Sequence, residues 1–295
     1  MGSPISPFAT FSARAGDGTA GTAVAVIRVL LALAPVALPA AYLVFLKREL
    51  AKHTIADGVR TSPPDPLLPI STSSASTKTD VDDDDDNDVD DDNYADDVIP
   101  PDVLASPERF VVSRERVTSR AIPVGSLRRD LLAVDVDTDS LDDDLLEAYL
   151  SATMRAFSWT PQALLMARMG TSVDDAAGFA RSFRAEYLQD RVFQAGDRLC
   201  GVYVVRSWRG GKAVLDLAPP RGWRGPVVRG ALGVGFEWER DGDGDGDGSV
   251  RFVNETVLWR GVEEKGTMLE GWVGRWMHGL LAGWLVVKGV EAVTD

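Results

Sequence analysis

The sequence predicts an α+β fold: a curved antiparallel sheet packed against a long C-terminal helix, with a helical insert, preceded by one transmembrane helix and a disordered acidic linker. Three observations predict the folded part. Residues 140–189 show helical spacing, residues 201–260 alternate as strands do, and residues 268–293 return to helical spacing. Helices and strands that are segregated along the chain are typical of α+β domains.

Composition allows a real core and excludes some classes of protein. The chain has 295 residues, 45% of them hydrophobic, and a net charge of −14. Residues 1–105 carry −10 of this charge and residues 106–295 carry −4. A basic footprint is missing, so nucleic-acid binding is not expected. Cys200 is the single cysteine and His53 and His278 are the two histidines, which excludes a disulfide framework and leaves little for a histidine metal site.

The N-terminal region predicts a membrane anchor. After a tail over 1–22, residues 23–46 are expected to form a transmembrane helix, because residues 29–46 contain no charge in 18 positions. More basic residues follow this run than precede it, so the positive-inside rule places the C-terminal part in the cytosol. A cleaved signal peptide, a mitochondrial presequence and a buried globular helix are the alternatives.

Residues 47–105 are expected to be a linker. Proline, serine and aspartate dominate the segment, which runs into VDDDDDNDVDDDN, and its aspartates repel one another. Such a composition buries too little apolar surface to order itself, so the segment is interpreted as a solvated spacer. The alternative is that the segment binds cations weakly and diffusely or contacts a basic partner.

The globular domain is expected over 106–295, and it begins with a strand over 116–124 and three helices. Ser140 and Asp143 form a capping box before the first helix. Thr160-Pro161 has the cap-then-proline pattern that starts a second helix, which ends at Gly170. Ser172 opens the third helix, which is expected to continue to Gln189.

Strand patterns follow. Residues 201–208 and 212–218 flank Arg209-Gly-Gly211 and predict a hairpin. Residues 231–240 and 249–260 flank DGDGDGDG, and the apolar residues of the first alternate with glycines and glutamates, as in a half-buried antiparallel strand.

The final segment, 268–293, carries a broad apolar stripe at helical spacing. Gly271, Gly274, Gly279 and Gly283 are unfavourable in a helix, so they indicate close backbone approach to the sheet. The alternatives are interfacial membrane contact and a second membrane span with a Gly-x-x-x-Gly packing motif. Arg275, His278 and Lys288 interrupt the apolar residues and leave a stretch too short for a span.

The order of elements over about 106–293 resembles the START-like helix-grip superfamily, which implies a sheet that grips a helix and encloses a hydrophobic ligand. The stretches GDRLCGVYVV and FVNETVLWR are similar to ones in uncharacterised fungal single-pass membrane proteins. The second similarity implies no activity.

The DGDGDGDG repeat matches the first half of a calcium loop at Asp241, Asp243 and Asp245. The second half does not match a calcium loop, because Phe252 occupies the position at which such a loop has a bidentate acidic residue. Between two strands, Asp-Gly repeats suit a hairpin tip, which is the preferred interpretation over a weak cation site.

Acid/base candidates are few. Asn254 and Glu255 are neighbours on a predicted strand, so their side chains point to opposite faces. A buried Glu255 could act as an acid or base, and the alternative is an ion pair on the outer face with an arginine such as Arg240 or Arg251. His278 on the last helix is the other candidate.

These patterns favour a membrane-tethered cytosolic domain that binds a hydrophobic small molecule or lipid, without a cofactor. The expected cavity contacts are Tyr203, Trp238, Asn254, Trp259 and Trp276. The alternatives are a small-molecule enzyme that uses Glu255 or His278 and a protein-interaction module, whose protein partner the residues do not specify.

Overall fold

The computed structural model describes residues 41–62, 98–131, 138–189, 193–239 and 248–295. The chain divides into two compact units, Met1–Arg48 and Glu49–Asp295. In the first unit, the described residues 41–48 are helical. Most of the transmembrane helix expected over 23–46 lies outside the described residues. Within the described ranges, no helix combines the length and apolar character that crossing a bilayer requires.

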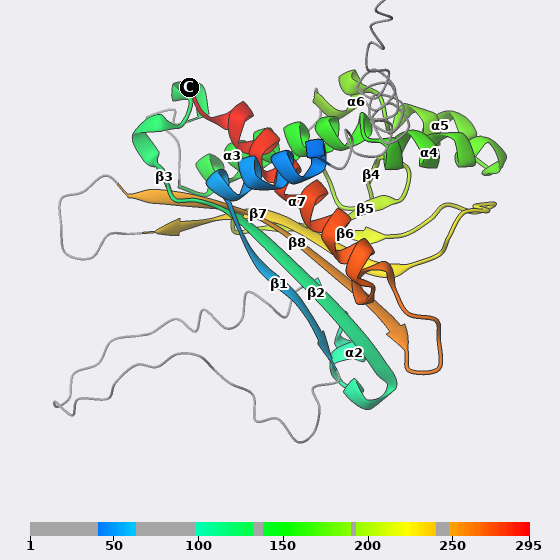
Figure 1. Ribbon diagram of the computed structural model, residues 1–295. Helices are drawn as coiled ribbons and strands as arrows, with labels where there is room; N and C mark the ends of the chain where they lie inside the picture. Colours follow the sequence, from blue (N-terminus) through cyan, green and yellow to red (C-terminus); the bar gives the residue numbers. More distant parts are fainter. Residues whose placement is uncertain (1–40, 63–97, 132–137, 190–192, 240–247) are drawn as a thin grey trace, which may run out of the picture. The chain divides into compact units, whose positions relative to one another are not determined.

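The second unit is an α+β domain built on an open antiparallel sheet and a C-terminal helix (Figure 1). In the described ranges the sheet has eight strands, ordered β1-β2-β8-β7-β6-β5-β4, with β3 also paired to β8. The strands are β1 Thr54–Ser62, β2 Phe110–Ser119, β3 Ile122–Pro123, β4 Arg198–Leu199, β5 Tyr203–Arg209, β6 Lys212–Leu217, β7 Arg229–Glu239 and β8 Ser249–Gly261.

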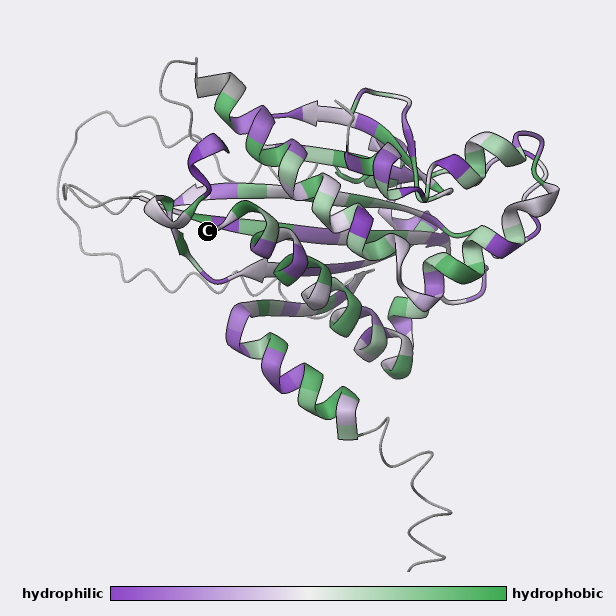
Figure 2. Cartoon of the chain, turned by 90° about the horizontal axis from the view of Figure 1, so that it is seen from above, coloured by the Kyte–Doolittle hydropathy of each residue, from purple (hydrophilic) through white to green (hydrophobic). Residues whose placement is uncertain are grey.

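Two long helices, α3 (Thr138–Ser158) and α7 (Trp272–Val293), pack together on one face of the sheet (Figure 1). Short helices α4 (Pro161–Met169), α5 (Ala176–Arg181) and α6 (Ala185–Gln189) follow α3. Seen from above, the helices lie over strands on which hydrophilic and hydrophobic residues alternate (Figure 2). One face of the sheet therefore meets the helices and the other turns away from them.

The core lies between α3, α7 and the sheet. Tyr149 of α3 packs against Phe252 of β8 with ring centroids 4.6 Å apart and ring planes tilted by 33°, and its hydroxyl donates to Asn254 Oδ1 at 3.1 Å. Gly289 of α7 faces Tyr149 so closely that a Cβ there would lie 2.2 Å from the ring. A helical glycine costs about 1 kcal/mol against alanine, and here it permits the close contact of α7 with α3.

The last helix begins later than expected, and its glycines approach different partners. Gly279 faces Glu115 of β2, where a Cβ would lie 3.2 Å from the carboxylate, whereas Gly274 faces the preceding turn, where a Cβ would lie 2.2 Å from Met268 O. A 3₁₀ turn, Met268–Glu270, precedes α7, and Gly271 is the N-cap residue. A Cβ at Gly283 would make only an ordinary contact, 3.5 Å from Thr54 Oγ1. The close contact of α7 with α3 is at Gly289, a glycine for which the sequence predicted no role.

Part of the expected linker belongs to the sheet. Residues 54–62 form β1, which pairs along β2 from Thr54↔Ser119 to Ser62↔Val112. The β-branched Thr54, Ile55 and Val59 favour this conformation, and the pairing covers the edge of β2. Val98 is buried on the face away from the helices, beside Val214 and Val257. The domain thus starts before residue 106.

The hairpin β5–β6 and the pair β7–β8 match the sequence prediction, with Gly210 and Gly211 at positive φ in the turn. The capped start of α4 also matches, because Thr160 Oγ1 accepts from Ala163 N at 3.2 Å. The third predicted helix is broken instead into α5 and α6, since the chain leaves the helix at Ser182, whose hydroxyl donates to Phe179 O.

Candidate functional site

A groove of about 280 Å³ lies between the helix-covered face of the sheet, α4, the 219–228 loop and the start of the C-terminal helical segment. Its lining is mostly apolar. The lining residues are Gln162, Leu165, Met166, Met169, Val202, Tyr203, Leu217, Pro219, Trp223, Pro226, Val228, Ala231, Leu232, Thr256, Leu258, Met268 and His278.

The helical wall comes from one face of α4. Gln162, Leu165, Met166 and Met169 follow the i, i+3, i+4, i+7 spacing that places side chains on the same side of a helix. The cap at Thr160 fixes where this helix starts and therefore which residues turn to the groove. Leu165 is 59% exposed, so it stands at the open side of the groove.

Cross-strand neighbours form the floor. Tyr203 lies directly opposite Leu217, and Leu232 lies directly opposite Thr256. Gly230 in β7 lets side chains from both adjacent strands approach, because a Cβ there would lie 2.5 Å from Leu258 and 2.7 Å from Leu217. Burial raises the pKa of the Tyr203 phenol, so this hydroxyl stays neutral and can donate or accept a hydrogen bond.

The 219–228 loop is held by local hydrogen bonds. Trp223 Nε1 donates to Pro226 O at 3.1 Å, and Asp174 N donates to Arg221 O at 3.2 Å. Gly222 has φ +77° and passes close to the backbone of Ser172, where a Cβ would lie 2.8 Å from the carbonyl oxygen. These contacts place Trp223 and Pro226 in the groove wall.

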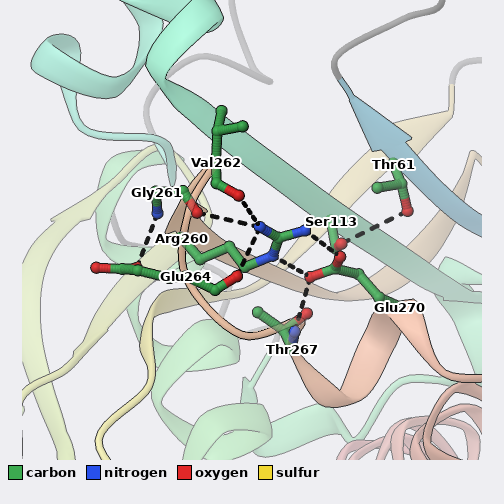
Figure 3. Close-up of polar contacts among 8 residues, drawn as sticks. All are labelled: Thr61, Ser113, Arg260, Gly261, Val262, Glu264, Thr267 and Glu270. Atoms are coloured by element: carbon green, nitrogen blue, oxygen red, sulfur yellow. Dashed lines mark hydrogen bonds and ion pairs between the residues drawn. The ribbon is translucent and has the colours of Figure 1, made fainter.

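The connection from β8 to α7 is organised by Arg260 (Figure 3). Its guanidinium binds Glu270 through two hydrogen bonds, Nε to Oε1 at 2.9 Å and Nη2 to Oε2 at 2.8 Å. Its Nη1 donates to the backbone carbonyls of Gly261, Val262 and Glu264. Arg260 also lowers the pKa of Glu270 to about 2. This network fixes the turn that carries Met268 into the groove.

His278 brings a polar group to the groove from α7. Its Nδ1 contacts Oε2 of Glu115 on β2, whose side chain is only 5% exposed. Gly279 makes room for this carboxylate, since a Cβ there would lie 3.2 Å from Glu115 Oε1. A carboxylate accepts, so Nδ1–H is the donor, and Nε2 is the ring nitrogen that remains for a ligand.

A small cavity of about 40 Å³ adjoins the groove. The two share Gln162, Tyr203, Leu232, Thr256 and His278. Asn254 and Thr153 add polar groups to the small cavity, beside Met154, Phe157 and Leu285. The groove is therefore apolar along its length and polar where it meets the small cavity.

The residues expected as cavity contacts divide into two groups. Tyr203 lines the groove and the small cavity, and Asn254 lines the small cavity. Trp259 packs on the opposite face of the sheet beside Val98 and Val257, because side chains alternate along β8. Trp238 donates to Asp142 near the start of α3, and Trp276 is half-buried on α7; neither is among the groove-lining residues.

The two acid/base candidates lie on opposite faces of the sheet. His278 lines the groove, whereas Glu255 is buried on the other face. Glu255 accepts from Arg114 Nε and lies 4.0 Å from Lys212 Nζ. Its partner is thus an arginine, but neither Arg240, which is outside the described residues, nor Arg251, which pairs with Glu239. Glu255 cannot act in the groove.

Some features of the site had no sequence signal. Glu115 lies on an edge-side strand far along the chain from His278, and the contact depends on the β2–β8 pairing. The face of α4 could be found from its cap and spacing, but not its orientation toward the sheet. The metal candidates Asp241, Asp243 and Asp245 lie outside the described residues.

Comparison of the chain with family models, curated proteins and solved structures gives no match. The resemblance to helix-grip domains therefore stays a prediction, and the function is argued from the groove itself.

Proposed function

We propose that the domain binds a hydrophobic small molecule or lipid in the groove between the sheet and α4. The observation that carries this proposal is the groove of about 280 Å³ with a mainly apolar lining. Ligand sites are typically concave and apolar, with a few polar groups that orient the ligand. The groove has both features.

The position of the polar groups defines the ligand more closely. Gln162, Tyr203, Thr256 and His278 lie where the groove meets the small cavity. An amphipathic ligand fits this arrangement, with an apolar body along Leu165 and Leu258 and a hydroxyl or carbonyl head beside His278. A fully apolar ligand would cover polar groups in this region without offering them hydrogen bonds, which costs about 1–3 kcal/mol for each group that it buries without a partner.

Two adjacent leucines on α4 provide the test. Leu165 lines the groove, Leu164 does not, and both are more than half exposed, so an aspartate at either position can be tolerated by the fold. Titration of residues 49–295 with N-phenyl-1-naphthylamine, followed by fluorescence, should show binding that Leu165→Asp weakens by about tenfold, equivalent to about 1.4 kcal/mol. Leu164→Asp should bind as the native chain does. Equal effects of both changes would refute the groove as the binding site.

A second function is supported by the His278–Glu115 contact. A histidine held by a buried carboxylate and facing a ligand groove is suited to proton transfer. In such an enzyme, His278 Nε2 takes a proton from the bound ligand and returns it to another atom of the same ligand, while Glu115 stabilises the imidazolium. Mass spectrometry of the bound ligand before and after incubation in deuterated water tests this function. The bound ligand is expected to gain deuterium on a carbon atom, and His278→Gln should abolish this gain. A ligand that gains no deuterium would favour simple binding.

We further propose that residues 23–46 anchor the domain in a membrane with the domain in the cytosol. The apolar run of 18 residues and the basic residues after it support this proposal. Trp272, Val273 and Met277 of α7 are also exposed, and Trp272 is 79% accessible. Exposed apolar side chains on the helix that also brings His278 to the groove suit exchange of an apolar ligand with a nearby bilayer. Release of the full chain by carbonate extraction would refute the anchor.

A further inference from the structure

A second hollow, of about 240 Å³, lies on the sheet face that turns away from the helices. It is lined by Arg60 of β1 and by Arg114 and Arg116 of β2, together with Asp57 and Gly58. Three arginines and one aspartate give this lining a formal charge of +2, in a chain whose net charge is −14. Glu255 and Glu237, which pair with Arg114 and Arg116, offset two of these charges, so Arg60 is the arginine that has no ion pair among the described residues.

Two of the arginines are fixed in orientation by carboxylates. Arg114 Nε donates to Glu255, and Arg116 Nη2 donates to Glu237. Burial acts to lower the pKa of Arg116, but the charge of Glu237, its hydrogen bond and the charges of Glu255 and Asp57 together outweigh burial and raise that pKa. Each guanidinium has five N–H donors, so each retains donors for a further anion. Arginine held in this way loses little freedom when it binds an oxyanion through two parallel hydrogen bonds.

The third arginine, Arg60, faces another arginine across the strand pair. Arg60 is directly opposite Arg114 in the β1–β2 pairing. Like charges directly opposite each other on antiparallel strands are destabilising. Arg60 is exposed, and none of the described residues forms an ion pair with it. An anion bound between Arg60 and Arg114 would convert this repulsion into attraction.

The strand irregularity shapes the hollow. The β1–β2 register shifts between Ala56 and Val59, and Gly58 has φ +76° with no atom within 4 Å of a Cβ built there. A β-bulge bends its strand and is frequent next to functional sites. The bulge leaves open space beside the three guanidinium groups.

We propose that Arg60, Arg114 and Arg116 form a binding site for a multivalent oxyanion, independent of the apolar groove. Two sources supply this chemistry: a free phosphate ester, or clustered carboxylates. The second source exists in the same chain, because residues 80–97 contain twelve aspartates and no basic residue. Phosphate and carboxylate oxygens both accept the paired N–H donors of arginine.

The test uses the full chain and inorganic pyrophosphate as the probe, with isothermal titration calorimetry at low ionic strength. Arg60→Gln is the informative change, because Arg60 is exposed and its loss breaks no ion pair among the described residues. Arg184→Gln is the matched control, since Arg184 is also exposed and precedes α6 on the helix-covered side. A third chain has the twelve aspartates of 80–97 replaced by asparagine.

Pyrophosphate should bind, and Arg60→Gln should weaken binding by about tenfold, as expected for loss of one charge-assisted contact, while Arg184→Gln changes it little. If pyrophosphate binds only to the variant with twelve asparagines, and a peptide of residues 80–97 competes with pyrophosphate for that variant, then the protein's own carboxylates are the ligand. If the native chain binds directly, a free phosphate ester is the ligand. Absence of binding in both chains, or equal binding by the two glutamine variants, overturns the site.

Discussion

The imidazole of His278 on α7 contacts the buried carboxylate of Glu115 on β2, and this contact joins the C-terminal helix to the sheet at the polar end of the groove. The pair brings together residues 163 positions apart. It holds the histidine ring in one orientation toward the groove. The contact is therefore both a part of the fold and a part of the candidate site.

A double-mutant cycle tests this pair. His278→Gln leaves Glu115 as a buried carboxylate without its partner, so the free energy of unfolding should fall by about 2–3 kcal/mol. Adding Glu115→Gln should restore part of this loss, with a coupling energy of about 1–3 kcal/mol. Urea denaturation of the native chain, both single variants and the double variant gives the four values. Strictly additive losses would show that the two side chains do not interact.

The contact of α7 with α3 at Gly289 predicts a large effect of a small substitution. Gly289→Ala should lower the free energy of unfolding by about 1–3 kcal/mol, since its Cβ would meet the Tyr149 ring and overpacking outweighs the gain in helix propensity.

Gly283→Ala is the matched control on the same helix. Its Cβ makes only ordinary contacts, so this variant should be as stable as the native chain or more stable by up to about 1 kcal/mol. Thermal unfolding followed by circular dichroism distinguishes the two. A more stable Gly289→Ala chain would contradict the packing of Tyr149 against α7.

Glu255 is expected to matter for stability rather than for groove chemistry. Glu255→Gln leaves Arg114 and the buried Lys212 without the carboxylate between them, so the free energy of unfolding should fall by about 2–4 kcal/mol. Glu239→Gln removes a more exposed carboxylate that pairs with Arg251 and should cost less than about 1 kcal/mol. Chemical denaturation measures both. Probe binding in the groove should be the same in the two variants, and a selective loss with Glu255→Gln would contradict its position on the opposite face.

The Arg260–Glu270 pair predicts a pH dependence of stability. Its hydrogen bonds lower the pKa of Glu270 from 4.5 to about 2 in the folded chain. A carboxylate with a lowered pKa stabilises the fold above its unfolded pKa, and this contribution is lost as pH falls from about 4.5 to about 2. The native chain should therefore exceed Glu270→Gln in unfolding free energy by about 1–2 kcal/mol at pH 6, given partial solvent exposure of the pair. The difference should vanish near pH 2, and a constant difference across this range would contradict the assignment.

Local sequence patterns predicted much of the fold. The cap at Thr160-Pro161, the Gly210-Gly211 turn and the alternation in β7 and β8 each act over a few residues, and each appears in the structure. The opposite faces of Asn254 and Glu255 follow from the same alternation. Patterns of this kind depend only on neighbouring residues and can be read without tertiary contacts.

The remaining features depend on contacts between distant segments. Residues 54–62 lack a strong pattern and become a strand because β2 offers an unpaired edge. The aromatic residues Trp238, Trp259 and Trp276 suggested a cavity by composition, but the position of each along its strand or helix places it elsewhere. Glu115 gave no signal, because only the folded sheet brings it to His278.

The central claim is that the groove holds an amphipathic small molecule. Native mass spectrometry of residues 49–295, purified gently from cells, tests it most directly when the native chain is compared with Leu232→Trp, which fills the place where the groove meets the small cavity. The account predicts that the native chain retains a bound apolar molecule of defined mass and that the folded Leu232→Trp chain does not. A native chain without ligand, or the same molecule bound to both chains, would contradict it.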